Sequence, residues 1–339
     1  MTKTNQNNII FKKGYLLKYL PDFSHIYVEK EILNHPFTKE ILSKFPKAVI
    51  IEIEHYKDKF NSYSQNFRSQ KNSQKLILAK KTAPFLYEAS SLIQKQDINF
   101  LYTTTMLNCI YDCHYCFLQG MYPSSNIVLF VNIEDFFKAT KEKLKEINNL
   151  FLSISYDTDV LAVENLFGIA KKWIEFSKNK PLKIEIRTKA ININNLELNE
   201  NVILSFSLSP EIVINKYELK TPSLDKRIKA INQVISQSYT PSIAIDPIIK
   251  VPNYKKVYKE FIDYIFSKID YTKLDSIIIG SFRMNSTQFK NIKKSGLLSD
   301  ILYNNYLVED GIVTYKDDEN LVEYVKSLLP DIKIYGLEN

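Results

Sequence analysis

The sequence predicts an α/β protein with a partial (β/α)6 TIM-like barrel, preceded by an N-terminal α/β extension and followed by a C-terminal segment with a hairpin and a helix. Between residues 98 and 282, short apolar runs with strand character alternate with amphipathic helical stretches. This alternation is typical of parallel strands joined by right-handed crossovers. Six such units are too few for a closed eight-stranded barrel, which favours a partial one.

Three parts of the chain follow from this pattern. We expect an N-terminal α/β segment over 1–97, a barrel over 98–282 and a C-terminal segment over 283–339. The first part contains two apolar runs that predict strands, at 48–53 and 75–80, and a polar stretch at 57–73 that predicts a loop. No chemistry is evident in this part. The last part contains Asp310-Gly311 between two short apolar runs, which indicates a hairpin, and then a helix at about 319–329.

The barrel elements can be placed in order. Residues that commonly cap helix N-termini precede the predicted helices, and they are Asn132, Asp159 and Ser223. Another amphipathic helix is predicted at 254–269. The six predicted strands are 98–104, 150–155, 183–188, 202–208, 242–248 and 275–281.

Composition and charge limit the class of protein. No run approaches the roughly 18 apolar residues of a membrane span, and the first residues lack the pattern of a secretory signal. We therefore expect a cytoplasmic protein without a membrane partner. The net charge is +7, from 45 basic and 38 acidic residues. This excess is compatible with a polyanionic partner, but scattered lysines could produce it without one.

All three cysteines of the chain, Cys109, Cys113 and Cys116, lie within eight residues in a C-x3-C-x2-C arrangement. A structural zinc site needs a fourth ligand, and His114 lies inside the tight loop, where it is poorly placed to supply one. Three thiolates with one open position suit a [4Fe–4S] cluster whose fourth iron binds another molecule. In this spacing that molecule is usually S-adenosylmethionine. Three unrelated buried cysteines are the alternative, and their confinement to eight residues disfavours it.

Polar residues follow several predicted strands at their C-terminal ends, where parallel barrels place their chemistry. Each one could equally be a surface residue, and Asp159 could simply cap its helix. Together they would converge on the cysteine loop. They are Ser155-Tyr156-Asp157-Thr158-Asp159, Lys189, the stretch Ser207 to Ser209, and Asp246-Pro247.

Five segments of the chain resemble spore photoproduct lyases, which are radical S-adenosylmethionine enzymes that revert a methylene-bridged thymine dimer in DNA. The resemblance implies that the three cysteines hold the cluster. It also implies that Thr158, Lys189 and Ser207 contact S-adenosylmethionine. The segments are CIYDCHYCFLQ at 109–119, FVNIEDF at 130–136, RTKA at 187–190, FSLS at 206–209 and TPSLDKRIKA at 221–230.

Three departures from the family concern the fate of the radical and the binding of DNA. The family returns a hydrogen atom to the product from a cysteine, and Tyr156 stands at that position. Of the family's two tyrosines around the third cluster cysteine, Tyr115 matches the first and Phe117 replaces the second. The family's late hairpin is basic and aromatic, whereas residues 303–318 are acidic here. The resemblance therefore implies Tyr156 and Tyr115 as the catalytic pair.

Three functional hypotheses follow. The first is a DNA-repair lyase in which Tyr156 replaces the thiol, with photoproduct-containing DNA as substrate and a reductant of the flavodoxin or ferredoxin type as partner. The second is a diverged radical enzyme of this family that acts on another substrate, because the thiol donor and the basic hairpin are missing. The third is a non-catalytic iron–sulfur or nucleic-acid-binding protein, which the retained cofactor residues disfavour.

Overall fold

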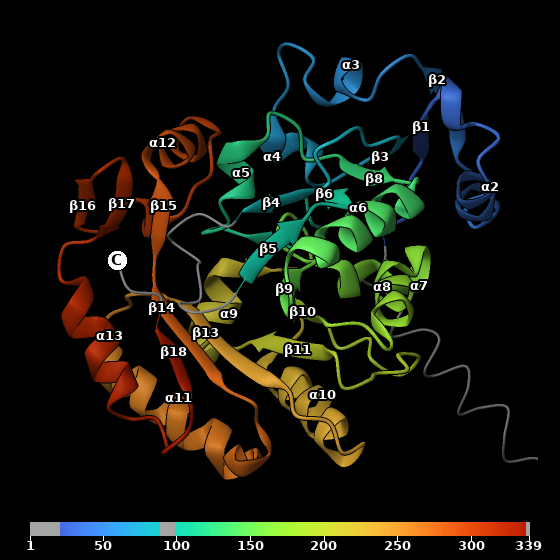
Figure 1. Ribbon diagram of the computed structural model, residues 1–339. Helices are drawn as coiled ribbons and strands as arrows, with labels where there is room; N and C mark the ends of the chain where they lie inside the picture. Colours follow the sequence, from blue (N-terminus) through green and yellow to red (C-terminus); the bar gives the residue numbers. More distant parts are fainter. Residues whose placement is uncertain (1–20, 89–98, 337–339) are drawn as a thin grey trace, which may run out of the picture.

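The computed structural model describes residues 21–88 and 99–336. Figure 1 shows a small N-terminal sheet at one side, a curled central sheet, and a C-terminal group of strands and helices at the other side. Among the described residues, no helix has both the length and the apolar character needed to cross a membrane. The strand predicted at the start of the barrel begins at Asn99, because residue 98 lies outside the described residues.

The N-terminal sheet has the strand order β2-β1-β3-β8-β6. Its first four strands are parallel and β6 pairs antiparallel with β8. Both predicted strands of this part are confirmed, but the loop predicted at 57–73 is wrong because it contains two short helices. The elements are β1 His25–Glu29, η1 Lys30–Ile32, α2 Pro36–Ser43, β2 Val49–Ile53, α3 Lys57–Phe60, α4 Phe67–Gln70, β3 Leu76–Ala79, β6 Met106–Leu107 and β8 Ile127–Phe130.

The central sheet has eight strands in the order β18-β14-β13-β11-β10-β9-β5-β4. The six predicted barrel strands lie side by side in chain order and are all parallel, which confirms the partial barrel. An antiparallel β4 and a parallel β18 complete its two edges. The strands are β4 Leu86–Glu88, β5 Asn99–Thr103, β9 Leu150–Ser153, β10 Leu182–Thr188, β11 Val202–Ser207, β13 Ser242–Ile248, β14 Ile277–Ser281 and β18 Ile334–Gly336.

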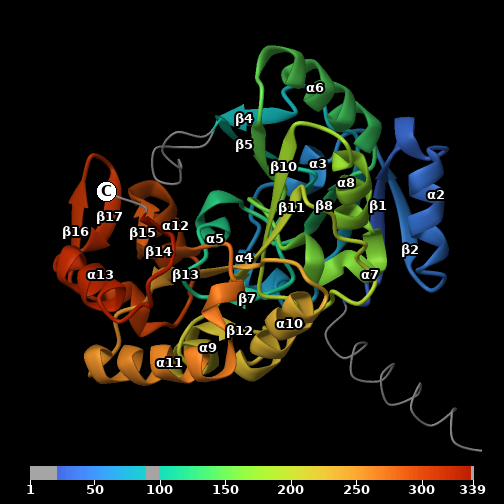
Figure 2. The ribbon, with the colours of Figure 1, turned by 60° about the horizontal axis from the view of Figure 1, so that its bottom comes forward.

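Helices cover the outside of this sheet, and Figure 2 shows α10 and α11 along one outer side. The helix predicted after Asp159 is interrupted at Gly168, a residue type that readily adopts the left-handed backbone at a helix end. The helix α9 was not predicted. The elements are α5 Leu118–Met121, α6 Ile133–Glu146, η2 Val160–Val163, α7 Glu164–Phe167, α8 Ile169–Ser177, α9 Glu211–Tyr217, α10 Leu224–Ser236, α11 Tyr254–Lys268 and η3 Tyr271–Lys273.

The predicted hairpin around Asp310-Gly311 is confirmed, and Val308 pairs with Val313 within it. A third strand, β15, pairs with β17 and connects this small sheet to the end of β14. The hairpin therefore lies next to the C-terminal ends of the barrel strands. The elements of this part are β15 Arg283–Asn285, α12 Ser286–Lys294, η4 Asp300–Tyr303, β16 Tyr306–Glu309, β17 Ile312–Tyr315 and α13 Asp318–Lys326.

Candidate active site

A cavity of about 680 Å³ lies at the C-terminal ends of the barrel strands. Its volume falls in the range of sites that hold small molecules and cofactors. Every site residue predicted from the sequence lines this one cavity, although along the chain these residues extend from the loop after β6 to the end of β11. These residues are Cys109, Cys113, Tyr115, Cys116, Tyr156, Thr158, Lys189 and Ser207.

The cysteine loop connects β6 to α5 and contains a short strand, β7 (Asp112–Cys113). This strand pairs antiparallel with β12 (Glu218–Leu219), so that Cys113 lies opposite Glu218. The loop begins at Asn108, whose backbone is left-handed and whose side-chain amide donates to two carbonyl oxygens, those of Ser124 at 2.7 Å and Asn126 at 2.8 Å. The loop is thus fixed at both ends before any ligand binds.

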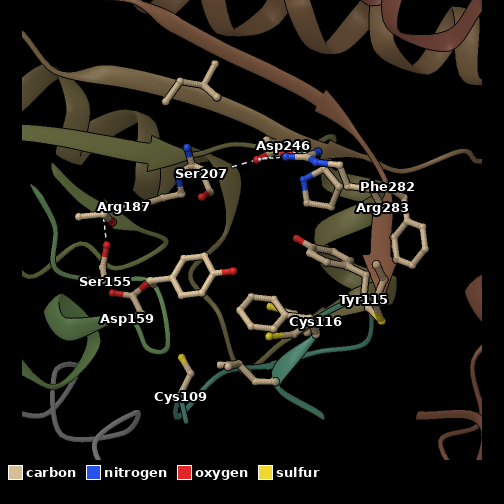
Figure 3. A pocket seen from close by; sticks show the side chains of 18 of the residues that line it. Cys109, Tyr115, Cys116, Ser155, Asp159, Arg187, Ser207, Asp246, Phe282 and Arg283 are labelled. Atoms are coloured by element: carbon tan, nitrogen blue, oxygen red, sulfur yellow. Dashed lines mark hydrogen bonds and ion pairs between the residues drawn. The ribbon is translucent and has the colours of Figure 1, made fainter. Parts of the chain in front are cut away.

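The three thiols are free, and Figure 3 shows Cys109 and Cys116 on the cavity wall. Among the described residues, no group of three Cys, His, Asp or Glu side chains could hold a single metal ion. Three thiols that share one loop and line one cavity suit a polynuclear cluster, in which each thiolate binds a different iron. His114 does not line the cavity, and its Nδ1 lies 3.0 Å from the Ser299 hydroxyl. That His114 is poorly placed as a ligand stays a prediction.

Burial dominates the protonation of these thiols. It raises the pKa of Cys109 to about 12 and also raises the pKa of Cys113 and Cys116. The Lys189 ammonium opposes this effect at Cys113. A metal that binds a thiol displaces its proton, so iron bound here would have to overcome the raised pKa of these sulfurs.

The predicted cofactor residues occupy the ends of three strands or the loops after them. The Thr158 hydroxyl is buried in the cavity wall and has no hydrogen-bond partner among the described residues, so it is available to a ligand. The Lys189 ammonium lies 5.6 Å from the centre of the Tyr115 ring. Ser207 is buried at the end of β11, and its carbonyl oxygen accepts from Nη1 of Arg227 at 3.0 Å.

Asp159 both caps a helix and shapes the cavity. Its Oδ1 accepts from the Ala162 amide at 3.1 Å and from the Thr188 hydroxyl at 2.7 Å. Its Oδ2 accepts from the Lys189 amide at 2.7 Å. The simple capping role predicted for this residue is confirmed at η2. The same carboxylate fixes the backbone that carries the Lys189 ammonium.

Tyr115 is anchored by a buried ion pair. Its hydroxyl donates to Oε1 of Glu218, and Oε2 of Glu218 accepts from Nη2 of Arg227 at 2.5 Å. Both charged side chains are fully buried. Burial raises the pKa of Glu218, but the positive charges of Arg227 and Lys189 outweigh it and hold this pKa below its usual value. Glu218 is therefore a buried carboxylate that accepts from a cavity tyrosine.

Tyr156 is half-buried, and aromatic side chains hold its ring. The ring centre lies 4.2 Å from that of Tyr102 and 5.5 Å from that of Phe117. Burial, and then the charge of Asp157, raises the pKa of Tyr156. The phenol therefore keeps its hydrogen at neutral pH and presents it at the cavity. The structure brings together the two positions at which the chain departs from the family, 117 and 156.

One group in the cavity wall was not predicted as a functional set. Asp246 accepts from Nη1 of Arg187 at 2.9 Å and from Nη1 of Arg283 at 2.9 Å. Figure 3 shows this group across the cavity from Cys109. A side chain at Gly280 would have its Cβ 2.7 Å from Nη1 of Arg283, so the glycine leaves room for the pair. The position of Asp246 at a strand end was the available signal, whereas nothing in the sequence indicated its partners.

A second group that was missed lies behind the cysteine loop, in the stretch predicted to lack chemistry. Arg68 donates to Oδ1 of Asp112 at 2.5 Å, and Lys71 donates to the carbonyl oxygen of Cys109 at 2.5 Å. Gln74 donates to the same carbonyl at 3.2 Å. These residues belong to α4 and the turn after it. They contact the loop without being part of the cavity lining.

Comparison with known proteins agrees with this site. The family model "Spore photoproduct lyase" matches residues 19–297, well over half of the chain. The chain belongs to this family. It is 26% identical over 292 residues to a spore photoproduct lyase of Clostridium acetobutylicum. This match covers 80% of this chain and 82% of the relative.

Two solved structures show the same fold at low identity. One is spore photoproduct lyase complexed with dinucleoside spore photoproduct, with a TM-score of 0.77 and 21% identity over 94% of this chain and 99% of that one. The other is a mutant with bound AdoMet and dinucleoside spore photoproduct, with a TM-score of 0.76 and 20% identity over 94% and 98%.

Family membership makes the chain a radical S-adenosylmethionine enzyme, with a [4Fe–4S] cluster and S-adenosylmethionine as its cofactors. The comparisons support the lyase hypothesis and do not favour an enzyme of this family with a different substrate.

Proposed function

We propose that this protein reverts the methylene-bridged thymine dimer of spore photoproduct in DNA. One observation carries the proposal. All eight residues selected by the resemblance to the family, which come from distant parts of the chain, line a single cavity at the catalytic end of the barrel. A protein that had kept the fold without the chemistry would have no reason to keep this set together.

The two cofactors can be assigned to the cavity by the chemistry of its side chains. Cys109, Cys113 and Cys116 would hold the cluster, and Thr158, Lys189 and Ser207 would hold S-adenosylmethionine. The unpartnered Thr158 hydroxyl and the Lys189 ammonium suit a ligand with a ribose and a carboxylate. When bound, this pair of cofactors supplies a 5′-deoxyadenosyl radical.

The protein has to orient and shield the reacting groups, and the cavity wall is suited to both tasks. Three of its aromatic members, Phe100, Phe117 and Phe282, offer no O–H or S–H bond, whereas Tyr111, Tyr115, Tyr156 and Tyr335 carry phenolic O–H groups. Asp246 is paired with two arginines of the wall. A wall of this kind limits the hydrogen donors that a product radical can reach.

We assign Tyr156 as the hydrogen-atom donor to the product radical, in place of the family's thiol. The donated atom is the phenolic hydrogen, which leaves a neutral phenoxyl radical on Tyr156. Tyr115 also lines the cavity, as do Tyr111 and Tyr335, and its O–H is hydrogen-bonded to the Glu218 carboxylate. We assign Tyr115 as the source of the hydrogen atom that converts the Tyr156 phenoxyl radical back to the phenol, which leaves the radical on Tyr115. Glu218 would position the Tyr115 hydroxyl by accepting its hydrogen bond.

DNA would reach the cavity past the β16–β17 hairpin, because Asp310 and Ile312 of this hairpin line the cavity. Its exposed surface is apolar and acidic, with Val308 58% exposed, in contrast to the basic hairpin of the family. We infer that electrostatic attraction contributes less to DNA binding in this protein than in its relatives. The electron for the cluster would come from a flavodoxin- or ferredoxin-type reductant, in a reducing cytoplasm where free thiols persist.

The test is anaerobic reconstitution with iron and sulfide, followed by incubation with S-adenosylmethionine and a reductant. A synthetic spore photoproduct dinucleotide is added to one set of samples and omitted from the other. We expect thymine product only in the first set. Cleavage to 5′-deoxyadenosine without any thymine product would overturn the lyase assignment and leave a radical enzyme with another substrate. Failure to bind a cluster would overturn the cofactor assignment itself.

A further inference from the structure

The side chain of Lys71 is a buried cation behind the cysteine loop. The residue is 4% exposed and does not line the cavity. Its ammonium donates to the carbonyl oxygen of Cys109 at 2.5 Å, and the Gln74 amide donates to the same oxygen at 3.2 Å. The backbone carbonyl of Lys71 in turn accepts from the Lys220 ammonium at 2.8 Å, which fixes its position.

Two other buried or nearly buried cations around the site have a carboxylate partner. Arg227 is paired with Glu218 at 2.5 Å, and the nearly buried Arg283 is paired with Asp246 at 2.9 Å. Within the described part of the chain, no carboxylate oxygen lies within 4.0 Å of the Lys71 ammonium. A buried charge without a counter-charge costs several kcal/mol, so this position calls for an anion. The thiolate-rich cluster held by Cys109 and its neighbours is an anion in the right place.

We propose that Lys71 is the counter-charge of the iron–sulfur cluster and makes the cluster easier to reduce. This proposal rests on the proposed function, because it requires the cluster to be held by the three cysteines. Reduction adds one electron from an external one-electron donor and makes the cluster one charge more negative. A fixed positive charge nearby stabilises that reduced form more than the oxidised one, which raises the reduction potential.

Lys71 differs in this respect from Lys189, the other lysine near the thiols. Lys189 lines the cavity, where we assign its ammonium to S-adenosylmethionine. Lys71 is not part of the cavity lining and contacts the loop through the carbonyl of Cys109. Its charge is therefore a positioning and tuning element for the cluster alone. Its effect should be measurable without S-adenosylmethionine or DNA.

The experiment compares the wild type with Lys71→Met, which removes the charge, and Lys71→Arg, which keeps it. Each protein is reconstituted anaerobically, assayed for iron and sulfide, and titrated with dithionite in the presence of redox mediators. The reduced cluster is quantified by electron paramagnetic resonance. We expect at least a tenfold lower ratio of reduced to oxidised cluster in Lys71→Met at a fixed potential, a shift of about 59 mV for one electron. Lys71→Arg should stay near the wild type.

Two control variants separate charge from packing. Gln74→Leu removes a neutral donor from the same carbonyl oxygen, and Lys75→Met removes a lysine whose ammonium contacts Ser24. Both should leave the potential near that of the wild type. Because Met could impair folding at this buried position, Lys71→Gln is a second neutral variant.

An unchanged potential in a fully loaded neutral variant would overturn the proposal. An equal shift in Gln74→Leu would also overturn it, since it would assign the effect to loop geometry. Neutral variants that fold but hold no cluster, or that do not fold, would show a structural role for Lys71 and reject the tuning role. A wild type that holds no cluster would instead reject the proposed function, which is a distinct result.

Discussion

The two sides of the cysteine loop differ in how completely their polar groups are paired. On the cavity side, the Thr158 hydroxyl has no hydrogen-bond partner among the described residues, and the Tyr156 ring packs against the rings of Tyr102 and Phe117. Behind the loop and beside it, Arg68 binds Asp112 and Arg227 binds Glu218, both at 2.5 Å. The open side is available to ligands, whereas the closed side holds the loop.

This difference separates two kinds of residue that a sequence motif cannot separate. Substitutions on the closed side should change the stability of the fold or the properties of the cluster. Substitutions on the open side should change turnover with little effect on stability. The predictions below test this division, beginning with the largest expected effect.

Arg227→Met should lower the free energy of unfolding by about 3–5 kcal/mol, because it leaves the fully buried Glu218 carboxylate without its cation. Urea unfolding of the cluster-free protein measures the change. The double variant Arg227→Met with Glu218→Leu should recover much of the loss, since it removes the stranded charge. A loss below about 1 kcal/mol in the single variant would contradict this prediction, because it would mean that the pair contributes no more to stability than an ordinary surface ion pair.

Tyr156→Phe should lower turnover of the photoproduct by about 100-fold, the scale expected when a positioned hydrogen donor is removed. Its free energy of unfolding should change by less than about 1 kcal/mol, because only the hydroxyl is lost. Tyr156→Cys installs the family's thiol and should retain more activity than the Phe variant. In deuterated water, the wild-type product should contain solvent-derived deuterium. Normal turnover in Tyr156→Phe would remove this residue from the reaction.

Asp157 tests the comparison through the pH dependence of stability, because it is a buried carboxylate that forms no ion pair with a described residue, unlike Glu218. It accepts from the Thr104 hydroxyl at 2.6 Å, and burial raises its pKa from the ordinary value of 3.8 to about 6. Between these two pKa values the folded state holds a proton that the unfolded state releases, so this carboxyl weakens the fold as pH rises from about 4 to about 6, and the loss then stays constant at higher pH.

Asp157→Asn should remove this loss and stabilise the protein at pH 8 by up to about 3 kcal/mol relative to the wild type, with little difference at pH 4. The measurement is urea unfolding of both cluster-free proteins at several pH values. A constant difference between the two proteins across the pH range would contradict the raised pKa.

The sequence predicted the repeated elements and the open side of the site better than the closed side. The six parallel strands are confirmed because each is a short apolar run with clear boundaries, as in Ile277–Ser281, where every residue is buried. Strand ends in a parallel barrel converge by geometry, so Thr158, Lys189 and Ser207 could be grouped without a structure. The boundaries at 97 and 282 remain predictions.

The closed side could not be predicted because its contacts join distant parts of the chain. Lys71 and Cys109 are 38 residues apart, and Arg68 and Asp112 are 44 apart. A buried lysine has no local sequence pattern that distinguishes it from a surface lysine. For the same reason, the stretch at 57–73 was interpreted as a polar loop although it contains two short helices whose side chains reach the cysteine loop.

The smallest expected effect concerns the hairpin, which lies at the opposite edge of the molecule from β2 (Figures 1 and 2). Glu309 is exposed on β16, next to the turn that reaches the cavity. Glu309→Lys should tighten DNA binding a few-fold and steepen its salt dependence by about two charges, because a phosphate attraction replaces a repulsion. Fluorescence anisotropy with a short duplex at several salt concentrations measures both changes. Glu52→Lys makes the same charge change on β2 and should leave the affinity nearly unaltered. Equal effects from the two substitutions would mean that only the net charge matters, and that the hairpin does not lie on the path of the DNA.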